Sequence, residues 1–237
     1  MPGLKKLSLG LVTAAAVLLR VSFLSASDKD VIPPELSKGQ RDNLRRFLEQ
    51  HDKPDRYVPA DAKVMDAQPA SIDTNIKSTP EEPIKQYMVQ ITSHRPVPGQ
   101  EKIERVDVYY YRPNPEKGKP GITVRHTVDL TTGKQVGATE VFLKRHTPLS
   151  REELDEAVQL ARDKSSAVQG LYKERDKKTV RWEYLQLMIN KKHETHEPGD
   201  RVVRLVFTAP AVEDQEAPSP VRVIVNLTKG LVVADAR

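Results

Sequence analysis

The chain has 237 residues and no cysteine, which excludes disulfides, thiolate metal sites and thiol catalysis. Its formal net charge is +5, but basic and acidic residues are interspersed along the sequence. A nucleic-acid-binding protein usually gathers its basic residues on one face, so this distribution argues against that class of partner. Because the chain has no disulfide or thiolate metal site, its fold must rest on apolar cores alone.

The N-terminus is predicted to be a signal peptide. Two lysines precede an apolar run from Leu7 to Leu19, and small residues follow up to Ser27. The run is shorter than the roughly 20 apolar residues of a membrane-spanning helix, and Arg20 interrupts it. We therefore expect cleavage near Ser27, a periplasmic or secreted protein, and no stable membrane insertion afterwards. Removing residues 1–27 takes away three cations and no anion, which lowers the net charge to about +2.

A repeated pattern, V-R-x-x-V-[D/N]-L-T-x-G-x-x-V, organises the rest of the chain. It begins at Val124 and again at Val221, an offset of 97 residues. Two further segment pairs match at the same offset, namely 106–113 with 203–210 and 86–88 with 183–185. Three strand-like segments in one register predict two copies of a single unit.

Each copy is predicted to open with a helix. A capping box, in which a serine is followed three residues later by Gln or Glu, occurs at Ser37 and at Ser150. These two serines are 113 residues apart, so the first unit carries extra residues between its helix and its sheet. We assign them to residues 53–83, a Pro-containing surface connection that partly wraps the unit.

The strands have the alternation of a sheet with one apolar face. In residues 122–130, apolar side chains alternate with polar ones, and His126 falls in the apolar series as a satisfied, half-buried residue. Short connections rich in Gly and Pro favour antiparallel hairpins. The prediction is an α+β fold of two tandem units, 33–147 and 148–237, each with one helix packed on a four-stranded antiparallel sheet.

A family resemblance rests on the second helix start and the strand ends. Residues 147–154 read T-P-L-S-x-E-E-L, and both copies have a strand ending in V-[D/N]-L-T-x-G-x-x-V. This combination resembles the tandem N-terminal domains of copper amine oxidases. The resemblance implies cystatin-like, non-catalytic units. That family's copper and quinone belong to a larger C-terminal domain with no counterpart here, and no tyrosine of this chain follows an asparagine. We therefore expect no enzyme activity and no bound cofactor.

His193 and His196 form the only cluster of metal-ligand residue types. They precede a predicted hairpin tip, where side chains three residues apart point to opposite sides of a strand. Zinc and copper sites normally need three or four ligands. A solvated turn is the favoured interpretation, and weak copper binding through the two histidines is the alternative.

Three consecutive tyrosines define the second candidate site. Tyr110 belongs to the core, whereas Tyr109 and Tyr111 share the outer face of the sheet with Arg125. Cover by the connection or the second unit is the favoured interpretation, and the alternative is a partner surface, because exposed tyrosines suit partner binding. The sequence thus predicts an exported interaction module that binds a protein partner or its own copy through this face or a sheet edge. The alternative function is an accessory or copper-associated component of an amine oxidase system.

Overall fold

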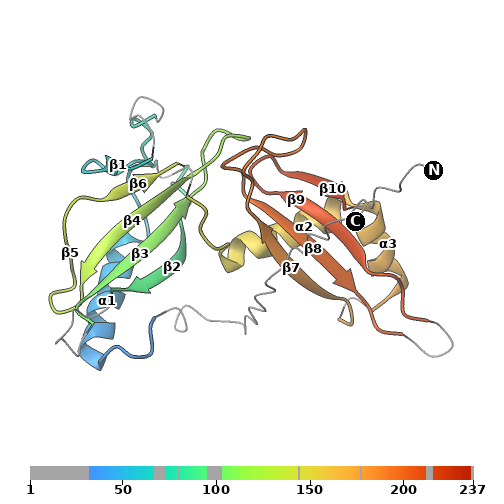
Figure 1. Cartoon of the computed structure of the whole chain (residues 1–237), viewed down its shortest axis with the longest axis horizontal. Coiled ribbons are helices and arrows are strands. Elements are labelled where there is room, and N and C mark those ends of the chain that lie inside the picture. Colours follow the sequence, from blue (N-terminus) through green and yellow to red (C-terminus); the bar gives the residue numbers. More distant parts are fainter. Residues whose placement is uncertain are drawn as a thin grey trace, which may run out of the picture.

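The structure is a computed structural model that describes residues 32–66, 73–79, 81–94, 103–143, 145–176, 178–211 and 216–235. In these residues the chain is α+β, with three helices and two separate sheets (Figure 1). The predicted signal peptide, residues 1–27, lies outside them. None of the described helices is both long enough and apolar enough to cross a membrane.

The first sheet has more strands than predicted. Its strands are β1 (Lys63–Val64), β2 (Tyr87–Ser93), β3 (Arg105–Arg112), β4 (Ile122–Asp129), β5 (Lys134–Gln135) and β6 (Glu140–Phe142). Their order is β1-β6-β4-β3-β2, with β5 also pairing with β4, and β1 runs parallel to β6. The prediction of four antiparallel strands is wrong for this sheet, because the connection 53–83 supplies β1 and the chain after β5 returns to β4 as β6.

The second sheet has the predicted four antiparallel strands. They are β7 (Arg181–Leu187), β8 (Val202–Thr208), β9 (Val221–Asn226) and β10 (Leu231–Ala234), in the order β10-β9-β8-β7. Each strand pairs with its neighbour in the sequence. This is a meander, the arrangement that short hairpin connections favour.

The two sheets share one register in three strands. Arg105 faces Asp129 in the first sheet, and Val202 faces Asn226 in the second, which are the same positions 97 residues later. The β4–β5 and β9–β10 pairs correspond in the same way.

The third match, of residues 86–88 with 183–185, is out of register. Tyr87 faces Tyr111, whereas Thr208, 97 residues after Tyr111, faces Arg181, only 94 residues after Tyr87. A register shift between Met88 and Gln90 displaces the rest of β2 by one more residue. The match of residues 86–88 therefore aligned residues three positions apart, and the offset grows to four after the shift.

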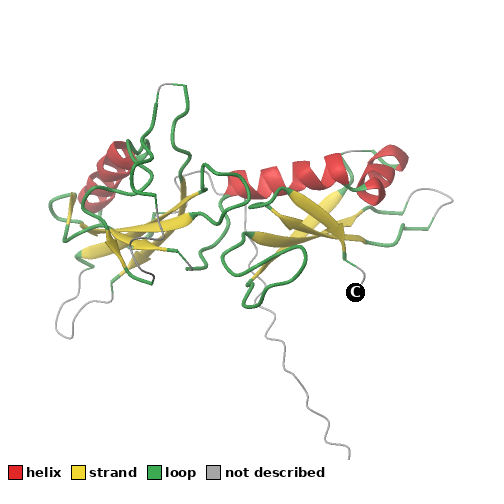
Figure 2. Ribbon diagram, turned by 90° about the horizontal axis from the view of Figure 1, so that it is seen from above, coloured by secondary structure: helices red, strands yellow, loops and turns green. Residues whose placement is uncertain are grey.

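The helices begin where the capping boxes predicted. Both α1 (Lys38–His51) and α2 (Arg151–Lys164) have 14 residues and a complete capping box. A third helix, α3 (Ser166–Glu174), was not predicted, and Ser165 both ends α2 and caps α3. Figure 2 shows that the helices lie on the same side of the two sheets.

Two separate cores hold the helices to the sheets. In the first, α1 contributes Leu44 and Phe47, which pack with the predicted apolar series of β4. Tyr57 and Val58, from the long connection, are also buried there, so the connection does wrap the unit. The second core has its own set of residues from α2, α3 and β7–β10.

Candidate functional site

The predicted partner surface on the first sheet is covered by the chain itself. Tyr109 is 4% exposed and Tyr111 is 7% exposed. The guanidinium of Arg145 lies 4.5 Å from the centroid of the Tyr109 ring, and that of Arg201 lies 4.3 Å from the Tyr111 ring. The expectation of an exposed partner surface is therefore wrong. The other interpretation, that a different part of the chain covers the tyrosines, holds for Tyr111, because Arg201 lies in the predicted second unit, whereas Tyr109 is covered by Arg145.

Arg125, the third predicted surface residue, is held in an ion-pair network. Its side chain is 25% exposed and pairs with Asp107 and with Glu140. Burial alone would lower the pKa of Arg125, but the hydrogen bond with Tyr109 and the two carboxylates outweigh it and raise the pKa. The guanidinium of Arg125 is thus already ion-paired with two carboxylates of the same sheet.

A buried ion pair lies beneath the Tyr111 ring. Arg201 donates from Nε to Glu153 Oε1 at 2.9 Å and from Nη2 to Glu153 Oε2 at 2.6 Å, and the two side chains are 6% and 4% exposed. Arg201 also donates to the carbonyl oxygens of Thr147 and Pro148. Glu153 is the capping-box residue of α2, so this pair ties the start of the helix to the start of β8. The site is structural, because its donors and acceptors are already satisfied.

The two histidines of the predicted metal site stack on each other. The ring centroids of His193 and His196 are 4.9 Å apart with an interplanar angle of 15°. The expectation that they point to opposite sides of a strand is wrong, because residues 189–200 form a loop whose backbone closes from His193 N to His196 O. Thr195 Oγ1 contacts both Nδ1 atoms, at 3.5 and 3.0 Å. In the described part of the chain, no three His, Asp or Glu side chains gather closely enough to hold a metal ion.

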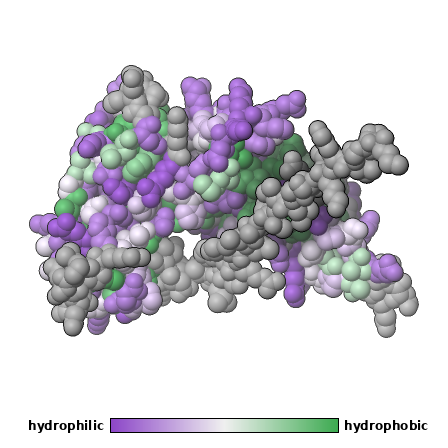
Figure 3. Space-filling view, in the orientation of Figure 1, coloured by the Kyte–Doolittle hydropathy of each residue, from purple (hydrophilic) through white to green (hydrophobic). Residues whose placement is uncertain are grey.

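The side of the second sheet that faces away from the helices carries aliphatic residues, of which one is exposed and three are half-buried. The strand register places Leu185, Val206, Ile224 and Val233 on this side, opposite the core residues of the same strands. We call these four residues the helix-free face. Figure 3 shows hydrophobic surface over the second sheet on this side of the molecule. Leu185 is 55% exposed, although large aliphatic side chains are usually buried.

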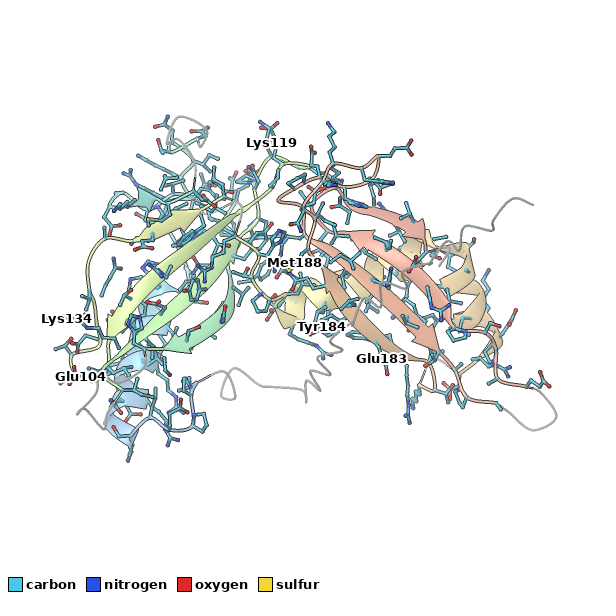
Figure 4. The ribbon with its side chains drawn as sticks, viewed as in Figure 1. Glu104, Lys119, Lys134, Glu183, Tyr184 and Met188 are labelled. Atoms are coloured by element: carbon cyan, nitrogen blue, oxygen red, sulfur yellow. The ribbon has the colours of Figure 1, made fainter. Side chains whose placement is uncertain are left out.

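One strand edge borders the helix-free face. Among the described strands, β7 pairs only with β8, so its other edge presents unpaired backbone groups. Met188, 65% exposed, directly follows β7 and lies at the end of that strand nearer the first sheet (Figure 4). Exposed apolar side chains beside an unpaired edge are typical of a surface that another chain covers.

The sequence contained a signal for this face. Ile224 stands at a position where the alternation of β9 calls for a polar residue, since Val223 and Val225 are its core residues. Leu185 and Val206 break the alternation of their strands in the same way. The three consecutive tyrosines of β3 are the more conspicuous feature of the sequence, and they lie in the first sheet.

A comparison with protein-family models and with curated proteins finds no match to this chain. The resemblance to the N-terminal domains of copper amine oxidases therefore stays a prediction from the residue pattern.

Proposed function

We propose that the mature chain is an exported, non-catalytic binding module that holds a protein partner on the helix-free face of its second sheet. The observation that carries this proposal is the exposure of Leu185 next to the unpaired edge of β7. Covering apolar surface contributes about 25 cal/mol per Å² removed from water. An extended partner segment can in addition pair with the backbone of β7.

We also propose that the two units are tandem copies of one cystatin-like module, related to the N-terminal domains of copper amine oxidases. The shared register of three strands and the two complete capping boxes support this relationship. The last residue of each box, Gln40 or Glu153, has an equivalent role. Gln40 donates to Ile103 O at 2.6 Å, just before β3, and Glu153 accepts from Arg201, just before β8.

Site-specific photo-crosslinking tests the binding surface. A photoreactive residue in place of Leu185 is expected to form a covalent adduct when the exported protein is irradiated in cells, and mass spectrometry then identifies a second copy or another protein. The matched control is the same replacement at Glu152, which is exposed on α2. No adduct at position 185, or equal adducts at both positions, would contradict the proposal.

A second candidate is an accessory role in a copper amine oxidase system. The resemblance suggests it, and the stacked rings of His193 and His196 supply two imidazoles in one loop. Copper titrated into the purified protein should then bind, and His193→Ala should abolish that binding. Unchanged binding in the variant would remove this candidate.

A further inference from the structure

A cavity of about 370 Å³ opens on the first unit, away from the helix-free face. It lies between the end of α1, the following loop and the side of the first sheet that α1 covers. Its polar lining includes the histidines His51 and His126, the cations Lys53, Arg56 and Arg112, and the carboxylates of Asp55 and Asp61. Cavities that bind small molecules commonly have a volume of roughly 300–1,000 Å³ and a few convergent polar groups.

The hydrogen bonds around His126 fix its tautomer. The Asp61 carboxylate can only accept, and its Oδ2 accepts from Gln135 Nε2 at 3.2 Å and from Thr139 Oγ1 at 3.0 Å. The amide of Gln135 therefore turns its Oε1 toward His126 Nδ1, 2.8 Å away. Because that oxygen can only accept, Nδ1 carries the proton and Nε2 keeps a lone pair.

The lone pair of His126 has no partner in the described chain. His126 is 4% exposed, and its Nε2 is buried without a hydrogen bond. The prediction of a satisfied histidine is therefore only half right, because Nδ1 has a partner and Nε2 has none. A buried acceptor left unpaired costs roughly 1–3 kcal/mol, so a donor from a bound molecule would stabilise the site.

His51 offers a second acceptor to the same cavity. Its Nδ1 lies 2.9 Å from Phe47 O, and since a carbonyl can only accept, Nδ1 carries the proton. Its Nε2 therefore also keeps a lone pair. The ring centroids of His51 and His126 are 5.1 Å apart, close enough for neighbouring hydroxyl groups of one ligand to reach both rings.

Arg112 adds a buried positive charge that forms no ion pair with a described residue, although the Asp55 carboxylate in the same lining acts on it electrostatically. Arg112 is 3% exposed, and it donates from Nε to Gln86 Oε1 and from Nη1 to the carbonyl oxygens of Arg56 and Tyr57. No described residue accepts from its Nη2. A buried cation is normally paired, and the planar guanidinium suits a carboxylate group.

We propose that this cavity binds a small hydroxylated carboxylate, of the chemical class of the sugar acids. The carboxylate pairs with Arg112, and the hydroxyl groups donate to His126 Nε2 and His51 Nε2. Lys53, Arg56 and Arg112 outnumber the carboxylates of Asp55 and Asp61 in the lining, and this excess of positive charge favours the entry of an anion. A metal ion fits less well, because Arg112 places a positive charge in the same cavity.

Three probes of the same carbon-chain length separate the contribution of the hydroxyl groups from that of the carboxylate. Gluconate carries both the hydroxyl groups and the carboxylate, sorbitol carries only hydroxyl groups, and hexanoate carries only the carboxylate. Each is titrated into the purified protein while NMR follows the side-chain nitrogens of His126 and Arg112. Gluconate is expected to shift both in a saturable manner and to bind at least about tenfold more tightly than either other probe.

His126→Phe keeps a ring in the core but removes the acceptor, and it should weaken gluconate binding about tenfold or more. The matched control is His94→Phe, at an exposed position outside the cavity lining, which should leave the affinity unchanged. The proposal is overturned if gluconate shifts neither side chain, or if His126→Phe binds it as well as the wild type does. It is equally overturned if sorbitol or hexanoate binds as tightly as gluconate, a comparison that needs no variant to fold.

Discussion

The guanidinium of Arg201 lies 4.3 Å from the centroid of the Tyr111 ring, so the end of β3 in the first sheet covers the start of β8 in the second. Burial raises the pKa of Tyr111 to about 12, and the phenol is therefore neutral beside the cation at physiological pH. Beneath the ring, Arg201 is paired with Glu153 of α2. Elements of both units thus meet at one buried charge pair.

Removing one partner of this pair should be costly. Arg201→Met leaves the Glu153 carboxylate, 4% exposed, without its cation, and we expect the free energy of unfolding to fall by about 3–5 kcal/mol in urea titrations. The matched control is Lys119→Met, which breaks an exposed pair with Glu116 and should cost less than about 1 kcal/mol. Equal losses in the two variants would show that the buried pair contributes no more than a surface pair.

Tyr111→Leu should weaken the coupling between the units. A desolvated cation–π contact contributes about 2 kcal/mol, and this variant removes it while keeping an apolar side chain. Trp182, on β7, is the only tryptophan, so its fluorescence reports on the second sheet, whereas circular dichroism reports on the whole chain. We expect the fluorescence transition of the variant to move to lower urea and away from the circular dichroism transition. Coincident, unshifted transitions would contradict the coupling.

His126 should make the protein less stable in mild acid. Burial lowers the pKa of His126 to about 4, against roughly 6.5 in an unfolded chain. The unfolded state therefore binds more protons between these values, and stability should fall by roughly 3 kcal/mol as the pH drops from about 6.5 to about 4. Urea titrations of the wild type and of His126→Phe at each pH isolate this contribution, because the other groups are shared. If both proteins lose the same stability over this range, His126 is not the cause.

Asp129 should be replaceable by Asn but not by Ala. Its Oδ1 accepts from the backbone of Thr131 at 2.9 Å and of Thr132 at 2.8 Å, and Asn226 accepts from Lys229 N in the equivalent turn. We expect Asp129→Ala to lower the free energy of unfolding by about 1–2 kcal/mol and Asp129→Asn to change it by less than about 0.5 kcal/mol, as measured by urea titration. An equal loss in both variants would show that the carboxylate charge, rather than the turn hydrogen bonds, stabilises this position.

The features that could be predicted from the sequence are those set by local periodicity. The capping boxes located the starts of α1 and α2, because their hydrogen bonds span only three residues. The apolar series of β4 gave its core-facing residues, and the offset of 97 residues gave the corresponding positions of the central strands in the two sheets, since side-chain alternation fixes the face of each residue.

The features that could not be predicted depend on contacts between distant segments. The two-residue strand β1 has no periodicity of its own, and only its pairing with β6 makes it a strand. The cover over Tyr109 and Tyr111 comes from Arg145 and Arg201, and nothing in the local pattern of β3 identifies those partners. The cavity beside His126 likewise combines residues from the helix end, the connection and three strands.

The parallel pairing of β1 with β6 has a consequence for how the first unit assembles. The backbone amides of Lys63 and Met65 donate to carbonyl oxygens of Thr139 and Val141, residues that are synthesised long after them. A nascent or truncated chain that stops before residue 139 therefore contains α1 and strands β1 to β5 but lacks β6, so β1 has no strand to pair with. Such a chain would expose an unpaired strand edge that can pair with another chain. A fragment meant to fold as the first unit should therefore extend beyond Phe142.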